Sequence, residues 1–246
     1  PLKTVDLLIP FEKFSDAARI IPELLKSDFS IAVCEFIDNA AVKYSERYLE
    51  KKYEYSDKAE AQLLMQIDGF DSDIVAANVE RCGEILLKNG ALDVFVAEDE
   101  KTKDRLWEMR RKLRDSLKYI GKDKIGEDVV VPRNKISELL IESRKLGENI
   151  GVNIVSYGHS GDGNVHINVV RDDLTEPLWN IRKIEAIEKI FDLSIKLGGT
   201  ISGEHGIGVL KKKYLTRRLS VGQIELMRKI KRSVDPLNIL DPGKIF

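Results

Sequence analysis

Along the first hundred residues, hydrophobic positions alternate between runs that suit strands and runs that suit helices. Apolar, β-branched runs predict strands at residues 4–10, 30–37, 61–67 and 92–97. Apolar residues at helical spacing predict helices at 15–26 and 73–88, and a stretch rich in Tyr, Lys and Glu predicts a helix followed by a loop at 43–58. Pro22 is expected to kink the first helix or to end it early.

The second half of the chain continues this alternation. A strongly charged helix, a turn, a strand and a further helix are predicted at 103–119, 121–126, 128–131 and 135–146. Strands at 152–156 and 167–170 make the segment between them a hairpin connection. A last helix opens on Ser220 and Gln223, which fit a capping box. Before it comes an amphipathic helix whose predicted apolar face consists of Leu178, Ile181, Ile184, Ile187 and Phe191.

Two strand–helix–strand units in succession predict an α+β fold. We expect a duplicated ferredoxin-like α/β sandwich, with helices covering one face of an antiparallel sheet and additional helices at the C-terminus. The repeat is one of pattern and not of sequence identity. No low-complexity linker divides the sequence, so residues 1–246 are predicted to form one domain.

Composition narrows the class of protein. The chain has 246 residues, 43% of them hydrophobic and 33% charged, as expected for a globular protein with a sizeable core. A net charge of -1 argues against a nucleic-acid binder, which normally carries a basic excess. Cys34 and Cys82 lie in apolar stretches, which favours reduced core residues. No apolar run approaches the ~20 residues of a membrane span, and no signal peptide opens the chain. A cytoplasmic protein that is not integral to a membrane is therefore predicted.

All three histidines fall inside two short glycine-rich segments, at 157–168 and 198–208. Histidine is the commonest metal ligand and the usual proton-transfer side chain near neutral pH. Glycine lets the backbone approach a ligand closely or adopt a positive φ. This distribution predicts one active site built from two loops.

The spacing of these residues divides their roles. His159 and His166 are seven residues apart, which suits the two ends of a tight loop between strands. Glu204 and His205 are adjacent, so their side chains are expected to diverge. Two histidines and a carboxylate form a common divalent-metal set, which assigns Glu204 to a metal and leaves His205 to move protons. The alternative is that the glycines only make turns and the histidines cap or pack.

Several motifs together resemble the C-terminal half of FAD-linked oxidases, a group that includes D-lactate dehydrogenase, the glycolate oxidase D subunit and D-2-hydroxyglutarate dehydrogenase. The resemblance covers essentially the whole chain and implies a vanillyl-alcohol-oxidase-like architecture. The family's N-terminal FAD-binding domain is missing, and the first residue is Pro1, so an excised fragment of a longer protein is expected. The matching segments are His159–Asn168, Ser202–Gly208, Leu106–Arg110, Glu127–Pro132 and Asp235–Lys244.

This resemblance implies specific roles. In the family, two loop histidines and a glutamate hold a divalent metal, and the next histidine is the proposed base; the matching residues are His159, His166, Glu204 and His205. The implied chemistry is oxidation of a D-2-hydroxy acid (lactate, glycolate or 2-hydroxyglutarate type) to the 2-oxo acid. FAD, bound mainly by the missing domain, and zinc or manganese are the implied cofactors. The implied partners are the acid, an electron acceptor (quinone, cytochrome or electron-transfer flavoprotein) that would draw the protein to the membrane periphery, and a second copy in a homodimer.

Residues around these motifs are expected to contact the substrate and the flavin. Arg110, Asn168 and Lys124 match substrate-binding positions, although Lys124 aligns imperfectly. Arg114 replaces another family residue and would favour a second acidic group, or it is an exposed helix arginine. Asp162 is interpreted as a turn residue or as one that orients a histidine. For Lys211 and its lysine neighbours, a solvated charge run is the alternative to a flavin contact. The expected cofactor-binding residues are Gly163, Asn164 and Lys211.

Two other functions stay open at this point. One is a non-catalytic metal-binding subunit that completes a complex with a separate flavoprotein chain. The other is a metallohydrolase that uses the same His-His-Glu set, but the chain has no HExxH helix to support it.

Overall fold

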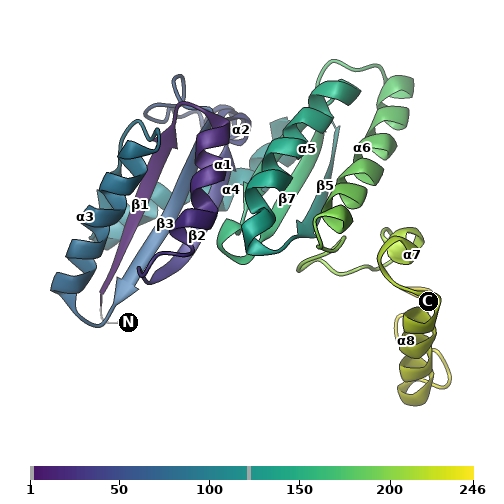
Figure 1. The fold of residues 1–246 in the computed structure, drawn as a ribbon. Helices are drawn as coiled ribbons and strands as arrows, with labels where there is room; N and C mark the ends of the chain where they lie inside the picture. Colours follow the sequence, from purple (N-terminus) through teal and green to yellow (C-terminus); the bar gives the residue numbers. More distant parts are fainter. Residues whose placement is uncertain (1–2, 121–122) are drawn as a thin grey trace.

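The computed structural model describes residues 3–120 and 123–246 and contains a seven-stranded sheet in the order β4-β1-β3-β2-β6-β7-β5 (Figure 1). Every pairing within this sheet is antiparallel. The strands are β1 Lys3–Phe11, β2 Ile31–Asp38, β3 Ala61–Gly69, β4 Phe95–Ala97, β5 Asp123–Val130, β6 Asn153–Gly158 and β7 Asn164–Arg171.

Capping side chains and a proline account for several of the helix ends. The Asp71 side chain caps α3 by accepting hydrogen bonds from two backbone N–H groups, and Ser220 and Gln223 form the predicted capping box of α8. Pro22 lies inside α1, which ends two residues later. The helices are α1 Phe14–Leu24, α2 Asn39–Leu49, α3 Ser72–Lys88, α4 Glu100–Ile120, α5 Ile136–Ile150, α6 Glu176–Lys196, α7 Leu215–Arg218 and α8 Val221–Val234.

The strand order confirms the predicted α+β fold and shows its duplication. The first unit, from β1 to β4, has the order 4-1-3-2 of a ferredoxin-like sandwich. The second unit repeats it with β5, β6 and β7, and a backbone bridge between Val130 and Thr200 stands where its fourth strand would lie. The units join through β2 and β6, where Phe36 pairs with Gly158 and Ile37 with Tyr157. The sheet is therefore continuous across the two repeats.

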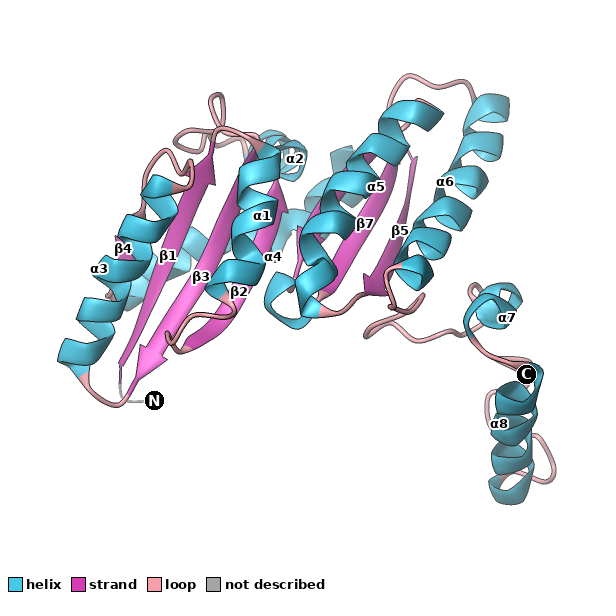
Figure 2. Cartoon of the chain, in the orientation of Figure 1, coloured by secondary structure: helices cyan, strands magenta, loops and turns pink. Residues whose placement is uncertain are grey.

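Helices cover both faces of the sheet, whereas the sequence predicted one covered face. Helices α1, α3, α5 and α6 bury the larger apolar core on one side (Figure 2). On the other side, α2 and α4 pack a second apolar cluster over the centre of the sheet, with Met109, Leu113 and Leu117 fully buried against Ile37 and Tyr157. The helix predicted as strongly charged, α4, therefore also has an apolar face that packs on the sheet.

Two further predictions were wrong in detail. Strand β5 begins at Asp123, because backbone pairing with β7 runs from Asp123 opposite Arg171 along the whole strand. The predicted turn at 121–126 is therefore strand from 123 onward, while residues 121 and 122 lie outside the described part of the chain. On α6 the buried face carries Trp179, Ile187 and Phe191, and Ile181 is 66% exposed.

The last elements of the chain extend away from the sheet (Figure 1). Helix α8 and the residues that follow it expose large apolar side chains, including Val221, Leu237 and Ile239. Among the described residues, no helix combines the length and apolar character that crossing a bilayer requires.

Candidate metal and acid-binding site

The two glycine-rich segments that carry the histidines meet at the junction of the two sheet units. His159 directly follows β6, His166 lies on β7, and Glu204 belongs to the loop after Thr200. The ligand atoms of these three residues all lie within 4.8 Å of one another. The closest approach, 3.3 Å, joins His166 Nε2 to a carboxylate oxygen of Glu204, and His159 Nε2 lies 4.0 Å from the other oxygen. The structure thus brings together the three residues that the sequence assigned to a metal.

The loop glycines are required by close backbone packing. Gly163 has φ of 78°, and a Cβ placed on it would lie 2.1 Å from the carbonyl oxygen of Val131. A Cβ on Gly203 would lie 2.6 Å from a carboxylate oxygen of Asp128. Any side chain at these two positions would therefore push the loops out of register.

Asp128 holds the second loop in place. It is fully buried on β5, and its carboxylate accepts hydrogen bonds from the backbone N–H groups of Gly203, Glu204 and His205, at 2.9–3.3 Å, and from the Ser202 hydroxyl. Burial raises the pKa of this carboxyl, but the bonds from His205 and Glu204 outweigh burial and keep the pKa below its usual value. A fixed anion thus anchors the segment that presents Glu204 and His205.

Replacing Asp128 by Ala is expected to release this loop without unfolding the sheet. The change leaves three backbone donors without their acceptor, at a cost of about 1–3 kcal/mol for each group that stays buried, whereas the Ser202 hydroxyl can still donate to the carbonyl of Gly206 at 3.0 Å. Amide hydrogen exchange at 202–206 should accelerate far more than exchange in β1 and β3. Exchange that stays as slow as in the wild type would show that Asp128 does not hold the loop.

His205 shares the cavity with the three clustered residues. Its ring stacks on His166 with centroids 5.3 Å apart and an interplanar angle of 17°, and its Nε2 lies 3.7 Å from Glu204. The expectation that Glu204 and His205 diverge was therefore wrong, because the Asp128 anchor turns both side chains toward the same cavity. His205 nevertheless lies outside the three-residue cluster that could hold an ion.

Two neighbouring carboxylates and burial set the protonation of the histidines. A hydrogen bond from His159 to Glu35 raises the pKa of His159. Burial lowers the pKa of His166 to about 4, so its imidazole is neutral near pH 7. A neutral imidazole keeps a lone pair for a metal, and His166 Nε2 faces Glu204.

A cavity of about 430 Å³ beside the cluster gathers the predicted substrate-binding residues. Arg110 and Arg114 enter it from α4, and Lys124 and Asn168 from β5 and β7. The Lys124 ammonium donates to Asn168 Oδ1 at 3.1 Å, and burial lowers the pKa of Lys124. Among the described residues, no carboxylate pairs with Lys124 or Arg114. Two positive side chains that no described carboxylate pairs with, Lys124 and the exposed Arg114, therefore line this cavity.

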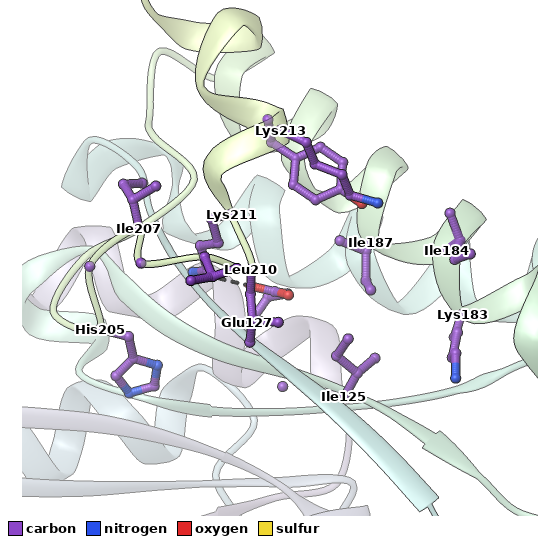
Figure 3. Close-up of a pocket in the computed structure, with 15 residues that line it drawn as sticks. Ile125, Glu127, Lys183, Ile184, Ile187, His205, Ile207, Leu210, Lys211 and Lys213 are labelled. Carbon is purple, nitrogen blue, oxygen red and sulfur yellow. Dashed lines mark ion pairs between the residues drawn. The ribbon is translucent and has the colours of Figure 1, made fainter. Parts of the chain in front are cut away.

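The three predicted cofactor-binding residues differ in their surroundings. Gly163 makes the tight turn described above, and Asn164 is buried with its Oδ1 lacking a partner among the described residues. Lys211 is only 7% exposed; its ammonium contacts Glu127 at 3.1 Å and the carbonyl of Ile201 at 2.9 Å. This buried ion pair is drawn in Figure 3. Because the Lys211 ammonium is already bound to Glu127 and Ile201, its position does not support a contact with a flavin phosphate.

A second cavity, of about 610 Å³, opens beside His205 (Figure 3). Apolar side chains from β5, α6 and the loop that follows Gly206 line it, among them Ile125, Ile184 and Leu210. Leu210 is 85% exposed. His205 thus lies between a charged cavity and an apolar one.

The sequence prediction missed two functional side chains, Glu35 and Asp128. Glu35 accepts hydrogen bonds from His159 at 2.6 Å and from Arg110 at 2.8 Å, and it is 2% exposed. The available signal for Glu35 was a lone acid in the apolar run Ile31–Ile37. For Asp128 it was an acid at the start of a predicted buried strand.

The chain belongs to the family described as FAD linked oxidases, C-terminal domain, whose model matches residues 1–245. It is similar to a D-lactate dehydrogenase of Archaeoglobus fulgidus (37% identity over 239 residues, 97% of this chain and 51% of that protein). It is also similar to a D-lactate dehydrogenase of Anaerostipes hadrus (32% over 250 residues, 100% and 52%) and to the glycolate oxidase subunit GlcD of Bacillus subtilis (32% over 240 residues, 98% and 50%). The chain spans about half the length of these relatives.

Solved structures agree on the fold. The chain superimposes on p-cresol methylhydroxylase with a TM-score of 0.71 at 17% identity, covering 100% of this chain and 53% of that one. Alkyldihydroxyacetonephosphate synthase matches with a TM-score of 0.53 at 16% identity, covering 98% and 43%. The predicted resemblance and fold class are thereby confirmed.

Proposed function

We propose that residues 1–246 are the substrate- and metal-binding domain of an FAD-dependent dehydrogenase that oxidises a D-2-hydroxy acid to the 2-oxo acid. The observation that carries this proposal is the convergence of His159, His166 and Glu204 beside a cavity lined by arginine and lysine. The names of the relatives, D-lactate dehydrogenase and glycolate oxidase subunit, support the substrate class.

The residues present fit a divalent ion. Two imidazoles and one carboxylate within 4.8 Å suit zinc or manganese. His159 and His166 each present Nε2 toward Glu204, so small side-chain rotations would bring all three to one ion. Three protein ligands would leave coordination positions for substrate oxygens. When bound, the metal would supply Lewis-acid stabilisation of the substrate alkoxide.

The chain's own residues would orient the acid and remove its proton. Arg110, with Asn168 and Lys124, would bind the substrate carboxylate from the α4 side of the cavity. His205, whose ring stacks on His166 and whose Nε2 lies 3.7 Å from Glu204, would accept the hydroxyl proton at an imidazole nitrogen. When bound in the flavin domain, FAD would accept the hydride from C2. The apolar cavity beside His205 would help to exclude water from the reacting carbon.

Arg114 is expected to favour substrates with a second acidic group. It lies in the same cavity, one helical turn beyond Arg110, and among the described residues it has no ion-pair partner. Arg114→Gln should raise KM for D-2-hydroxyglutarate at least several-fold and leave KM for D-lactate nearly unchanged. Arg114 is exposed in the structure, and equal effects on the two acids would show that it has no role in specificity.

A dye-coupled screen of the full-length protein tests the proposed function. D-lactate, glycolate and D-2-hydroxyglutarate should be compared with their L enantiomers where these exist. We expect flavin-dependent dye reduction with at least one D-2-hydroxy acid, and we expect residues 1–246 alone to be colourless and inactive. Hydrolysis of esters or amides without flavin, and no oxidation of any acid, would contradict the proposal.

An alternative starts from the word "subunit" in the name of the glycolate oxidase relatives, which says that those proteins assemble with other chains. In it, this chain completes a complex with a separate flavoprotein chain without being catalytic itself. In both versions the electrons would pass to an acceptor such as a quinone, a cytochrome or an electron-transfer flavoprotein. A homodimer, a cytoplasmic location and peripheral attachment to a membrane through the acceptor are parts of the same proposal.

A further inference from the structure

One buried carboxylate, from the unit of the sheet formed by β1 to β4, contacts both His159 of the proposed metal site and Arg110, which is proposed to bind the substrate. Glu35 lies on β2, and its two oxygens are used separately: Oε1 faces His159 Nδ1 at 2.6 Å, and Oε2 accepts from Arg110 Nε at 2.8 Å. The side chain is 3% exposed, so water does not compete for either contact. One carboxylate thus contacts one proposed metal ligand, His159, and one proposed substrate-binding residue, Arg110.

We propose that Glu35 is a positioning residue that sets the tautomer of His159 and the orientation of Arg110 at once. This inference rests on the proposed function, because it assigns Glu35 a role toward the ion and the substrate. A proton held on Nδ1 by Glu35 leaves the Nε2 lone pair directed at Glu204 and His166, where the ion would bind. No motif of the two histidine loops contains this residue.

The contact between Glu35 and Arg110 orients the proposed substrate-binding residue. Because Nε is bound to Glu35, the two terminal nitrogens of the guanidinium stay directed to the cavity, where they can pair with a carboxylate. The guanidinium carbon also lies 5.3 Å from the centre of the Tyr157 ring, which limits its rotation. The contacts with Glu35 and with the Tyr157 ring together fix both the plane and the direction of the Arg110 guanidinium.

Packing alone does not account for an acid at this position. Ile37, two residues along β2 and so on the same face, is fully buried in the apolar cluster under α4. Burying a carboxylate there costs more than burying an isoleucine unless charged donors compensate. The donors are His159 and Arg110, both of which are site residues. The position is therefore better explained by the site than by the fold.

Glu35→Gln in the full-length protein separates the two contacts. The amide keeps the volume of the side chain but offers one acceptor and one donor group. The charged Arg110 is expected to keep the carbonyl, so the amide N–H₂ would donate to His159 Nδ1 and force the proton onto Nε2. We expect zinc affinity, measured by competition with a chromogenic chelator, to fall about 10–100-fold. KM for the hydroxy acid, measured at saturating zinc, should change by less than threefold.

In Glu35→Ala both contacts are lost, so zinc affinity should fall and KM should also rise at least tenfold.

Asp6→Asn is the matched control. Asp6 is also a carboxylate buried on a strand and also contacts α4, since it accepts from Trp107 Nε1 at 2.7 Å and from Gln66 at 2.7 Å. It lies outside the cavity. We expect this variant to lower thermal stability but to leave zinc affinity and KM unchanged. Equal losses of zinc affinity in Asp6→Asn and Glu35→Gln would reduce the role of Glu35 to general stability.

A readout without metal distinguishes failure of this inference from failure of the proposed function. If the wild-type protein binds neither zinc nor manganese, the metal proposal is wrong, but the tautomer of His159 can still be read from imidazole ¹⁵N chemical shifts in the metal-free protein. At a pH high enough to make the imidazole neutral, we expect its one proton on Nδ1 in the wild type and on Nε2 in Glu35→Gln. Unchanged ¹⁵N shifts together with unchanged zinc affinity would overturn the role of Glu35.

Discussion

Replacing His166 or Glu204 by alanine in the full-length protein is expected to abolish metal retention and most of the activity while the fold stays intact. A three-residue set that loses one ligand has too few donors left to compete with water for the ion. His166 sits on β7 with its ring in the cavity, and the Glu204 side chain is 49% exposed, so neither removal opens the apolar core. The same loss is expected for His159. Elemental analysis, dye reduction and thermal unfolding on the same samples would measure all three properties.

Asp162→Ala is a suitable control for these variants. Asp162 lies in the same loop as His159, its side chain is 77% exposed, and its ion pair with Arg133 spans 3.8 Å. Metal content and activity of this variant should match the wild type. A Glu204→Ala protein that keeps a full equivalent of metal would exclude Glu204 as a ligand.

Replacing His205 by asparagine should have a different signature. If His205 accepts the hydroxyl proton and is not a ligand, kcat should fall about 10²–10⁴-fold, the usual contribution of a positioned general base. Metal content and substrate affinity should remain close to those of the wild type, because the backbone of residue 205 still donates to Asp128. The rise of kcat with pH that reports loss of the imidazole proton should disappear.

Metal analysis of the same variant decides between the two roles of His205. Its ring lies 5.3 Å from His166 and its Nε2 lies 3.7 Å from Glu204, so a fourth ligand position is within reach of a side-chain rotation. Loss of the metal together with activity in His205→Asn would make His205 a ligand. The proton acceptor would then have to be another group.

The sequence was most informative where contacts are local. His159 and His166 face each other across a hairpin seven residues apart, and alternation of apolar and polar positions already indicated the flanking strands. The repeated strand–helix pattern similarly indicated the duplicated sandwich. Short-range geometry and periodicity were sufficient for these features.

Features that depend on long-range pairing could not be predicted in this way. Glu35 meets His159 because β2 pairs with β6, more than a hundred residues later in the chain. Asp128 meets Gly203 and His205 through a loop whose course no local pattern determines. Strand β5 extends back to Asp123 because β7 supplies its hydrogen bonds, which outweighs the turn-like composition of that segment.

The proposed function requires that the His159–His166–Glu204 cluster holds an ion on which hydroxy acid oxidation depends. The most direct test strips the full-length protein with a chelator and titrates zinc or manganese back while D-2-hydroxy acid oxidation is followed with a dye. We expect activity to be lost on stripping and to return in proportion to bound metal, reaching its maximum at one ion per chain. Full activity in stripped protein that contains no divalent metal by elemental analysis would contradict the proposed function.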